Sequence, residues 1–540
     1  MKLSRLRCRT GNDVTDAYLE GDARIRAFYD YGFDRDSLKR RALDVAKRYD
    51  ESQRVLLLEA IREQQNDMTD IQRAQWERLR DPRALVVVTG QQAGLFTGPL
   101  YTIHKALSTV ALARQMEQEM GVPVIPVFWV AAEDHDFDEV ASAHYVTDEG
   151  TLRRVALKTR PVPRTPVGFH DVPAREMREM LERISADLRD GLYTADLVAG
   201  LNALHAEHSR MGTLFQKTLQ AWLGEFPILV IDPTTRAMRR AAAASFAQVL
   251  DRPRVFRDAA LAGAKRLRDA SFKTQVDVSA EHSLLYLIQD RIRTPLDLCE
   301  QADALKMRDS GELIQIETLK ERLRDEPEIF SAGVLYRPVV QDFLLPVLAY
   351  VGGAAEVSYH AMMGEIFREA GRTIPPLFLR QRVTLVPPSI VRSAKRLGLS
   401  WRDDVHAALR DKVAQSMNPP LSRVVDEMKQ EIRELLGGRE TYFDEVGHRA
   451  RRDLQKTQAT FLREIERLAA RSERALRNKH KEHAALSERM TAWLEPKGGE
   501  QERILSPLSI LAHFGTSWMH ILAGLDATEM NDMIYLEITE

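Results

Sequence analysis

Residues 85–139 constrain the fold of this chain more than any other stretch, because they have the pattern of one complete β-α-β unit. Leu85 to Val88 is an unbroken apolar run, typical of a parallel strand buried on both faces. A glycine-rich turn follows, then apolar residues at helical spacing from Leu100 to Met120, and a second strand from Pro123 to Val130. Open α/β sheets bind ligands at the carboxyl ends of their strands, so the polar residues there are candidate site residues.

Similar apolar runs recur later in the chain. Residues 226–231 predict a third strand, residues 346–351 a fourth, and residues 375–386 a further extended segment. Between 234 and 330 the sequence is charged and mostly helical, with one possible strand near 284–288. Strands that alternate with helices predict an α/β fold with a Rossmann-like parallel sheet as its core.

The last third of the chain has the spacing of a coiled coil. Residues 421–435 carry apolar side chains at alternating intervals of four and three, and a second series runs from Val446 to Trp493 after Gly437 and Gly438. A continuous helix over 439–494 would be roughly 80 Å long at 1.5 Å per residue. So long an arm buries little of its own surface, which favours a hairpin that also pairs with a second subunit; a solvated spacer is the alternative.

Four regions follow from these patterns. They are 1–82, a helical segment packed on the core; 83–390, the Rossmann-like core with connecting insertions at about 140–220 and 234–335; 391–496, a coiled-coil dimerisation arm; and 497–540, a segment that docks on the core.

Composition excludes several classes of protein. The net charge of −2, with 29% charged residues, gives no reason to expect nucleic acid or anionic lipid as a partner. No uncharged apolar run approaches the ~20 residues that a membrane span needs. The two cysteines, Cys8 and Cys299, stand in no paired motif, so neither a disulfide framework nor zinc is expected. These features predict a cytoplasmic protein.

The glycine-rich turn and the helix after it form the first candidate site. The Walker A and G-x-G-x-x-G patterns are both missing, but a helix N-terminus after such a turn can bind an anion. The arrangement is similar to class I aminoacyl-tRNA synthetases and related nucleotidylyltransferases, with a single histidine in the signature. A tight structural turn is the alternative. The candidate residues are Gln91, Gln92, Gly94, Thr97, Gly98, Tyr101, His104 and Lys105.

An acidic cluster follows the second strand and forms the second candidate site. It contains Glu133, Asp134, His135, Asp136, Asp138 and Glu139. Carboxylates this close repel one another unless cations offset them, and an ammonium substrate, nucleotide-bound Mg²⁺ or Arg and Lys neighbours would all serve. His135 could act as a base or a ligand, although the H-E-x-x-H pattern of zinc proteases is missing. A solvated loop is the alternative.

Weaker candidates lie at other strand ends. Gly352 and Gly353, with Glu356 and Tyr359, have the form of a ligand-facing loop before a helix. Asp232 ends the third predicted strand, and Arg380 lies in an extended run where an inward guanidinium needs an anionic partner.

Several long segments together resemble one known family. Val87 to Lys105, Pro126 to Glu139, Leu345 to Tyr359 and Gln501-Glu502-Arg503 are similar to segments of the bacillithiol-biosynthesis cysteine-adding enzymes, BshC. The chain length and the late coiled coil match as well, so the resemblance covers essentially the whole chain. It implies a ligase that joins L-cysteine to glucosaminyl-malate in the last step of bacillithiol synthesis, and a homodimer through the coiled coil.

The resemblance also implies a chemistry and roles for the candidate residues. ATP, with Mg²⁺ as an option, is the expected source of activation, through a cysteinyl-adenylate or an acyl phosphate. The turn at Gly94, Thr97 and Gly98, with His104 and Lys105, would hold nucleotide phosphate or the activated carboxyl. Glu133, Asp134 and Asp136 would bind amines, His135 would assist proton removal, and Trp129 and Arg503 would contact substrate or nucleotide. A nucleotidylyltransferase acting on another small substrate, and a nucleotide-binding scaffold that works through its coiled coil, remain alternatives.

Overall fold

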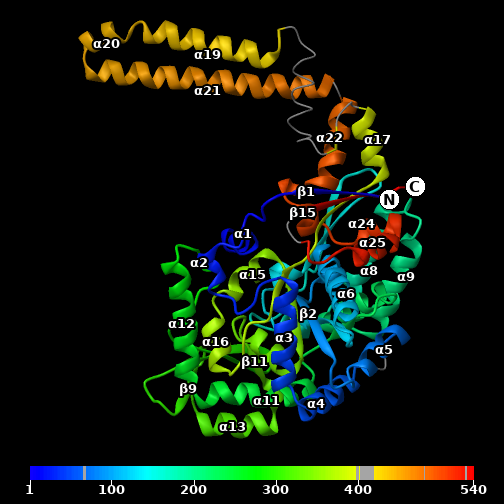
Figure 1. Cartoon of the computed structure of the whole chain (residues 1–540). Coiled ribbons are helices and arrows are strands. Elements are labelled where there is room, and N and C mark those ends of the chain that lie inside the picture. The colour runs from blue at the N-terminus through cyan, green and yellow to red at the C-terminus, as the bar shows by residue number, and fades with distance from the viewer. Residues whose placement is uncertain (65–67, 397–399, 402–418, 480, 530–531, 540) are drawn as a thin grey trace. The chain divides into compact units, whose positions relative to one another are not determined.

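The computed structural model describes residues 1–64, 68–396, 400–401, 419–479, 481–529 and 532–539 (Figure 1). The chain forms two compact units. The first comprises Met1–Asp148, Arg153–Thr384 and Gln501–Leu536, and the second comprises Glu149–Leu152, Leu385–Glu500 and Glu537–Glu540. The largest part of the second unit, Leu385–Glu500, is therefore inserted between two stretches of the first unit.

A five-stranded sheet forms the core of the first unit. Its order is β13-β12-β2-β3-β6, and every neighbouring pair is parallel. The strands are β2 (Leu85–Gln92), β3 (Val124–Ala131), β6 (Leu229–Ile231), β12 (Val347–Gly352) and β13 (Leu377–Leu379). Counted along the chain this is the order 5-4-1-2-3, which is the Rossmann arrangement, and the predicted fold class is confirmed. The order reverses between β2 and β12, where such sheets leave a crevice at their carboxyl ends.

Helix α6 (Tyr101–Met120) explains why both faces of this sheet lack polar side chains. It contacts β2, β3 and β12 on one side and α25 (Ser517–Gly524) on another, so most of its length is buried (Figure 1). Gly121 ends the helix in the left-handed conformation, at φ 65°. The apolar run of β2 is buried to within 1% exposure at Val86, Val87 and Val88.

A second five-stranded sheet lies in the predicted 234–335 insertion, where the sequence indicated mostly helix and one possible strand. Its order is β10-β9-β8-β7-β11, and all pairs are antiparallel. The strands are β7 (His282–Gln289), β8 (Ile292–Leu298), β9 (Ala304–Met307), β10 (Leu313–Gln315) and β11 (Phe330–Ala332). The strand expected near 284–288 is confirmed as part of β7, but the other four strands were missed. In β8 the buried charged residues Arg293 and Asp297 give the strand the sequence pattern of a surface segment.

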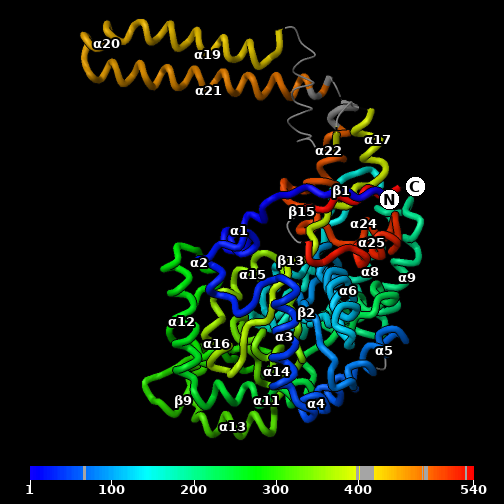
Figure 2. The backbone as a smooth tube through the Cα atoms, in the orientation of Figure 1, coloured from blue at the N-terminus to red at the C-terminus, as the bar shows by residue number. Residues whose placement is uncertain are grey.

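The N-terminal region is also less helical than expected, because it begins with strand β1 (Lys2–Arg7). With β15 (Asp532–Glu537) and β14 (Arg382–Val386) it forms a three-stranded sheet in the order β1-β15-β14 (Figure 2). Two further strands, β4 (Ser142–Val146) and β5 (Leu152–Ala156), pair with each other.

The remaining helices surround these sheets. In the N-terminal half they are α1 (Asp13–Glu20), α2 (Ala23–Arg26), α3 (Arg35–Arg48), α4 (Glu51–Arg62), α5 (Asp70–Arg78), α7 (Phe137–Val140), α8 (Ala174–Asp187), α9 (Thr194–Glu207), α10 (Met211–Trp222), α11 (Arg236–Asp251) and α12 (Pro253–Asp269). Later ones are α13 (Ile316–Asp325), α14 (Arg337–Leu344), α15 (Ala354–His360), α16 (Gly364–Glu369), α23 (Gln501–Ile504) and α24 (Leu508–Phe514). Short 3-10 turns occupy Leu95–Thr97, Val167–Phe169, Pro327–Ile329 and Pro496–Gly498.

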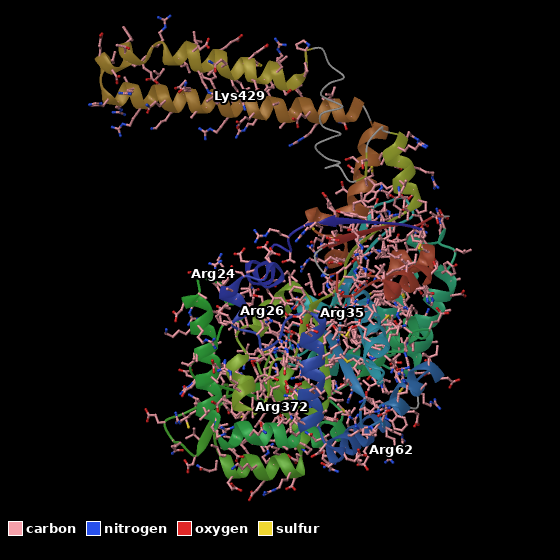
Figure 3. The ribbon with its side chains drawn as sticks, in the orientation of Figure 1. Arg24, Arg26, Arg35, Arg62, Arg372 and Lys429 are labelled. Carbon is pink, nitrogen blue, oxygen red and sulfur yellow. The ribbon has the colours of Figure 1, made fainter. Side chains whose placement is uncertain are left out.

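The second unit contains the predicted coiled coil. Its helices are α17 (Pro388–Arg396), α19 (Leu421–Gly437), α20 (Glu440–Val446), α21 (His448–Lys479) and α22 (Lys481–Leu494). Helices α19 and α21 form an antiparallel hairpin, and Lys429 Nζ of α19 lies 3.1 Å from Glu466 Oε1 of α21 (Figure 3). The expected continuous helix over 439–494 is interrupted at Gly447, whose φ of 124° is not helical. Parts of the predicted arm, 397–399, 402–418 and 480, lie outside the described residues.

Candidate functional site

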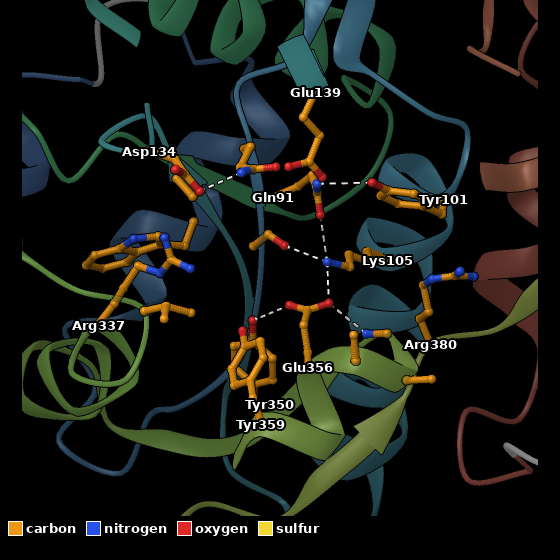
Figure 4. Close-up of a pocket in the computed structure, with 18 of the residues that line it drawn as sticks. Gln91, Tyr101, Lys105, Asp134, Glu139, Arg337, Tyr350, Glu356, Tyr359 and Arg380 are labelled. Atoms are coloured by element: carbon orange, nitrogen blue, oxygen red, sulfur yellow. Dashed lines mark hydrogen bonds and ion pairs between the residues drawn. The ribbon is translucent and has the colours of Figure 1, made fainter. Parts of the chain in front are cut away.

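A cavity of about 330 Å³ opens where the sheet order reverses, between the carboxyl ends of β2 and β12 (Figure 4). Its lining residues belong to the first unit, and four of them are cationic and three acidic. They are Gly90, Gln91, Gln92, Tyr101, Lys105, Trp129, Ala131, Asp134, Glu139, Val334, Arg337, Gln341, Tyr350, Gly353, Ala354, Ala355, Glu356, Tyr359, Arg380 and Arg503. Eleven of these were predicted site residues: Gln91, Gln92, Tyr101, Lys105, Trp129, Asp134, Gly353, Glu356, Tyr359, Arg380 and Arg503.

Lys105 lies at the centre of the cavity wall, on the second turn of α6. Its ammonium donates to Gly90 O at 2.9 Å and Gln91 Oε1 at 2.8 Å, and it pairs with Glu356 Oε2 at 2.5 Å (Figure 4). Glu356 is itself fixed at the start of α15, because it accepts hydrogen bonds from Gly353 N and the Tyr350 hydroxyl, both at 2.7 Å. Burial lowers the pKa of Lys105, and Glu356 opposes this. The ion pair therefore holds one positive charge at a fixed point of the wall.

Arg380 supplies a second fixed cation, next to Tyr101. Its guanidinium pairs with Glu502 of α23 at 2.6 Å and lies 5.3 Å from the centre of the Tyr101 ring. Glu502 Oε2 also accepts hydrogen bonds from His104 Nδ1 at 2.8 Å and Val383 N at 3.0 Å. Burial raises the pKa of Tyr101 to about 12, so its hydroxyl stays protonated and accepts the hydrogen bond from Gln91.

His104 is fully buried and does not line the cavity, which corrects its predicted catalytic role. Burial lowers the pKa of this imidazole, although Glu502 favours the charged form. The neutral ring donates from Nδ1, because the Glu502 carboxylate can only accept. His104 thus acts through Glu502 on Arg380 and has no direct access to a ligand.

The acidic side of the cavity is formed by Asp134 and Glu139, which follow β3. Gln92 Nε2 donates to Asp134 Oδ2 at 2.5 Å, and Asp134 Oδ1 accepts from His135 N at 2.7 Å. Burial would raise the pKa of Asp134, but Arg337 and Gln92 lower it. Glu139 points into the cavity from the rim (Figure 4). Its pKa is raised by partial burial and by the nearby carboxylates Asp134 and Asp136. One carboxyl group is therefore held ionised and the other is easier to protonate.

Arg337, the first residue of α14, faces the cavity from the side of β11. The Tyr359 hydroxyl is its hydrogen-bond partner. Burial opposes its charge, but Tyr359 and Asp134 favour the charged form, and its pKa is raised. The sequence contains one signal for it: Arg337 and Asp342 are the two charged residues in an otherwise uncharged stretch from 329 to 351.

Three predicted members of the acidic cluster lie outside the cavity lining. Glu133 is buried and pairs with Arg239 while accepting a hydrogen bond from Ser331. The His135 Nδ1 lies 3.5 Å from Arg293 Nη1. Burial lowers the pKa of His135, and the positive charge of Arg293 lowers it further. Asp136 is exposed and caps α7 by accepting from Glu139 N at 3.3 Å. Amine binding by Glu133 and Asp136 and proton removal by His135 therefore have no support from the lining of this cavity.

The predicted phosphate-binding turn also lies outside the cavity lining. Gly94 packs so closely on Gly98 that an added Cβ would meet the Gly98 Cα at 2.8 Å, and Gly98 has φ 71°. Thr97 is fully buried in the same turn. Leu100 N, at the start of α6, already donates to Leu505 O at 2.7 Å. These glycines are explained by packing, which was the alternative left open by the sequence.

Two other predicted residues do not reach the cavity. Gly352 ends β12 behind Glu356, where an added Cβ would meet the Glu356 Cβ at 2.9 Å. Asp232 accepts hydrogen bonds from the Thr234 amide and hydroxyl, and burial raises its pKa. Residues that line the cavity but were not predicted include Gly90, Gln341 and Tyr350, which carry no distinctive signal in the sequence.

Comparison with family models covers almost the whole chain. Residues 1–381 match the model described as "Bacillithiol biosynthesis BshC, N-terminal Rossmann-like domain", and residues 383–538 match "Bacillithiol biosynthesis BshC, C-terminal coiled-coil domain". The chain belongs to the BshC family. The resemblance found in the sequence is confirmed.

Curated BshC relatives align along most of their length. Those from Salinibacter ruber and Bacillus licheniformis are each 29% identical, covering 81% and 80% of this chain and 80% and 79% of their own. The relative from Halalkalibacterium halodurans is 26% identical over 98% of both chains. All three carry the name "Putative cysteine ligase BshC".

Two further observations bear on cofactors and location. Within the described ranges, no group of three or more His, Cys, Asp or Glu side chains is placed to hold a metal ion. No helix among the described residues is both long enough and apolar enough to cross a bilayer.

Proposed function

We propose that this chain is a ligase that joins the carboxyl group of L-cysteine to the amine of glucosaminyl-malate, forming an amide bond. The names of its relatives support a cysteine ligase. The observation that carries the proposal is one cavity at the sheet reversal, lined by the fixed cations Lys105 and Arg380 and by the carboxylates Asp134 and Glu139. A condensation of an acid with an amine needs both kinds of group side by side.

We propose that ATP binds on the cationic side of this cavity. When bound, it would supply the phosphate that activates the cysteine carboxyl, because a free carboxylate does not condense with an amine at neutral pH. Lys105, Arg380 and Arg503 line this side, and their positive charges would attract its phosphate groups; Glu356 holds Lys105 in place and Glu502 holds Arg380. Their preorganisation would stabilise negative charge that builds during carboxyl activation and amide formation.

The acidic side would handle the amines. Asp134, ionised and partly enclosed, would bind an ammonium group. Glu139 would accept the proton that the attacking sugar amine loses as the C–N bond forms, because its raised pKa suits a general base. Glu139 would then take the role that the family resemblance implied for His135, which does not line the cavity.

We further propose that the α19–α21 hairpin pairs with a second copy of the chain. It exposes large apolar side chains that a single hairpin leaves in water, with exposed fractions of 61% at Leu435, 63% at Val446, 48% at Phe461 and 45% at Leu468. Heptad-spaced helices bury such side chains against a partner helix.

The test is product formation by the purified protein with ATP, L-cysteine and glucosaminyl-malate, followed by mass spectrometry. Release of AMP and pyrophosphate would indicate an adenylate, and release of ADP and phosphate an acyl phosphate. Asp134→Asn should lower kcat/KM by about 100-fold or more, the size expected for a lost charged contact in the transition state. Asp138→Asn is the matched control, because this side chain is 71% exposed, lies outside the cavity and should leave kcat/KM unchanged.

Other results would overturn the proposal. Amine-independent pyrophosphate exchange with a different acid would indicate a nucleotidylyltransferase. Dimerisation without any ATP-dependent condensation would indicate a scaffold.

A further inference from the structure

Two opposite charges face the same side of the cavity without touching each other. Gln92 and the His135 amide are the hydrogen-bond partners of Asp134. The Tyr359 hydroxyl is the partner of Arg337. Figure 4 shows Asp134 and Arg337 on the same side of the cavity. Among the described residues, no carboxylate forms an ion pair with the Arg337 guanidinium within 4.0 Å. Asp134 and Arg337 are nevertheless close enough for each to favour the charged form of the other. A guanidinium has five N–H donors, so most of the hydrogen-bonding capacity of Arg337 is available to a ligand.

Trp129 lines the same cavity as this pair and carries a buried donor. The indole N–H of Trp129, on β3, is enclosed and has no hydrogen-bond partner among the described residues, although the side chain lines the cavity and is only 2% exposed. Buried N–H groups are almost always paired, so this unpaired one, in a side chain that lines the cavity, is a candidate donor to a ligand acceptor. The donor and the guanidinium both favour a bound anion at this point.

The other well-defined cations of the cavity are already engaged by carboxylates of the protein. Lys105 uses its hydrogens on Gly90, Gln91 and Glu356, and Arg380 pairs with Glu502. The carboxylate of a small ligand would therefore find its strongest bidentate partner at Arg337. Asp134, at the neighbouring point, can receive a cation attached to the same ligand.

We infer that Asp134, Arg337 and Trp129 form a subsite for an α-amino acid. Its ammonium group pairs with Asp134, and its carboxylate accepts hydrogen bonds from the Arg337 guanidinium and the Trp129 indole. An α-amino acid carries its two charges one carbon apart, so it can lie between two protein charges that are near each other but not in contact. This inference rests on the proposed function and deepens it, because it assigns L-cysteine to the Asp134 side and leaves the Lys105 and Arg380 side to phosphate.

The test compares the binding of L-cysteine with analogues that each lack one charge. Cysteamine lacks the carboxylate and 3-mercaptopropionate lacks the amine. Affinities are measured by calorimetry or ligand-observed NMR on the full chain, with and without a non-hydrolysable ATP analogue. In Arg337→Gln, the affinity for L-cysteine should fall about 10- to 100-fold, as expected for a lost charge-assisted hydrogen bond, while the affinity for cysteamine stays unchanged. In Asp134→Asn, the affinities for L-cysteine and cysteamine should fall, and the affinity for 3-mercaptopropionate should stay unchanged.

Two more variants refine the test. Arg337→Lys keeps the charge but loses the planar fork, so L-cysteine should bind with intermediate affinity. Trp129→Phe removes the indole N–H and keeps most of the packing. It should therefore lower the affinity for L-cysteine and 3-mercaptopropionate but not the affinity for cysteamine. Unchanged binding of the unaffected analogue in each variant shows that the cavity is still folded.

The inference is overturned if Arg337→Gln binds L-cysteine as the wild type does, if it weakens cysteamine equally, or if the wild type binds no L-cysteine in either condition. It is also overturned if the variant loses affinity for L-malate alone, because Arg337 would then serve the sugar substrate. Product formation is assayed separately. If the variants show the expected binding pattern but the wild type forms no product, the proposed function is wrong and the subsite stands. If the wild type forms product but Arg337→Gln binds L-cysteine with unchanged affinity, the subsite is wrong and the proposed function stands.

Discussion

Glu502 Oε2 lies 2.8 Å from His104 Nδ1, although 398 positions separate the two residues in the chain. The other oxygen of the same carboxylate pairs with Arg380, which lines the cavity. A segment near the end of the chain thus holds a cation of the candidate site in place, through a residue that never meets the ligand.

This relationship predicts a pH-dependent contribution to stability. Burial would raise the pKa of Glu502, but Arg380 and His104 lower it well below the ordinary glutamate value. A carboxyl group with a depressed pKa stabilises the fold above its unfolded pKa, and this contribution is lost as the pH falls toward its folded pKa. Glu502→Gln should therefore lower the free energy of unfolding by about 3 kcal/mol at neutral pH, because it leaves Arg380 buried without an anion.

The difference in the free energy of unfolding between the wild type and Glu502→Gln should become smaller as the pH falls below about 4.3, where the glutamate of the unfolded chain is protonated. Chemical denaturation across this pH range measures it. Glu495→Gln, at an exposed position seven residues earlier in the chain, is the control and should stay within about 0.5 kcal/mol of the wild type. A Glu502→Gln protein with the same pH dependence as the wild type would contradict the ion-pair account.

The buried Lys105–Glu356 ion pair predicts how kcat/KM declines as the pH rises into the alkaline range. Because burial lowers the pKa of Lys105, its ammonium should lose its proton below the ordinary lysine range, and kcat/KM should decline with it. Lys105→Arg keeps its charge to much higher pH. This variant should have a lower maximal rate, since a guanidinium cannot reproduce the three contacts of the ammonium, but its alkaline decline should move upward. If kcat/KM declines at the same alkaline pH in the wild type and in Lys105→Arg, Lys105 is not the titrating group.

Close packing of β2 on β3 predicts the effect of adding one methyl group. A Cβ at Gly90 would lie 2.8 Å from Trp129 O, which is backbone and cannot move aside without distorting the sheet. Gly90→Ala should destabilise the protein by about 1–3 kcal/mol. Gly200→Ala is the matched control: Gly200 lies on α9, an added Cβ there meets nothing within 4 Å, and alanine should be neutral or stabilise by up to about 1 kcal/mol. Thermal unfolding of both variants distinguishes the two effects, and equal melting temperatures would refute the packing argument.

The exposed apolar residues of the hairpin predict a dimer interface, and a charged residue placed in that interface should disrupt the dimer. Phe461→Glu should shift the protein from dimer to monomer in analytical ultracentrifugation, because a carboxylate at a buried helix interface is costly. Arg463→Glu changes the charge on the same helix at an exposed polar position and should leave the dimer intact. If the wild type sediments as a monomer, the proposed pairing is wrong.

The fold was largely predictable because its information is local. The runs that became β2, β3, β6 and β12 are apolar enough to identify as buried parallel strands, and the topology then brings their carboxyl ends together. Lys105, Asp134, Glu356 and Arg380 were found for this reason, although they are far apart in the sequence.

The errors in the candidate site have a common physical origin, which is the direction of a side chain within its element. His104 and Lys105 are neighbours on α6, but successive residues of a helix point about 100° apart, so one meets Glu502 and the other the cavity. After Asp134 the chain turns toward α7, which takes His135 and Asp136 away from the lining. These directions depend on partners such as Arg293, which lies in a sheet that the sequence did not reveal.

The carbonyl of Leu505 receives the hydrogen bond of Leu100 N, and Arg503 of the same segment lines the cavity. Residues 501–536 belong to the first unit but follow the whole coiled-coil insertion in the chain. On a ribosome, the helical hairpin therefore emerges before the last wall of the ligand site exists. A chain truncated before Gln501 would therefore contain the arm but lack the last wall of the ligand site.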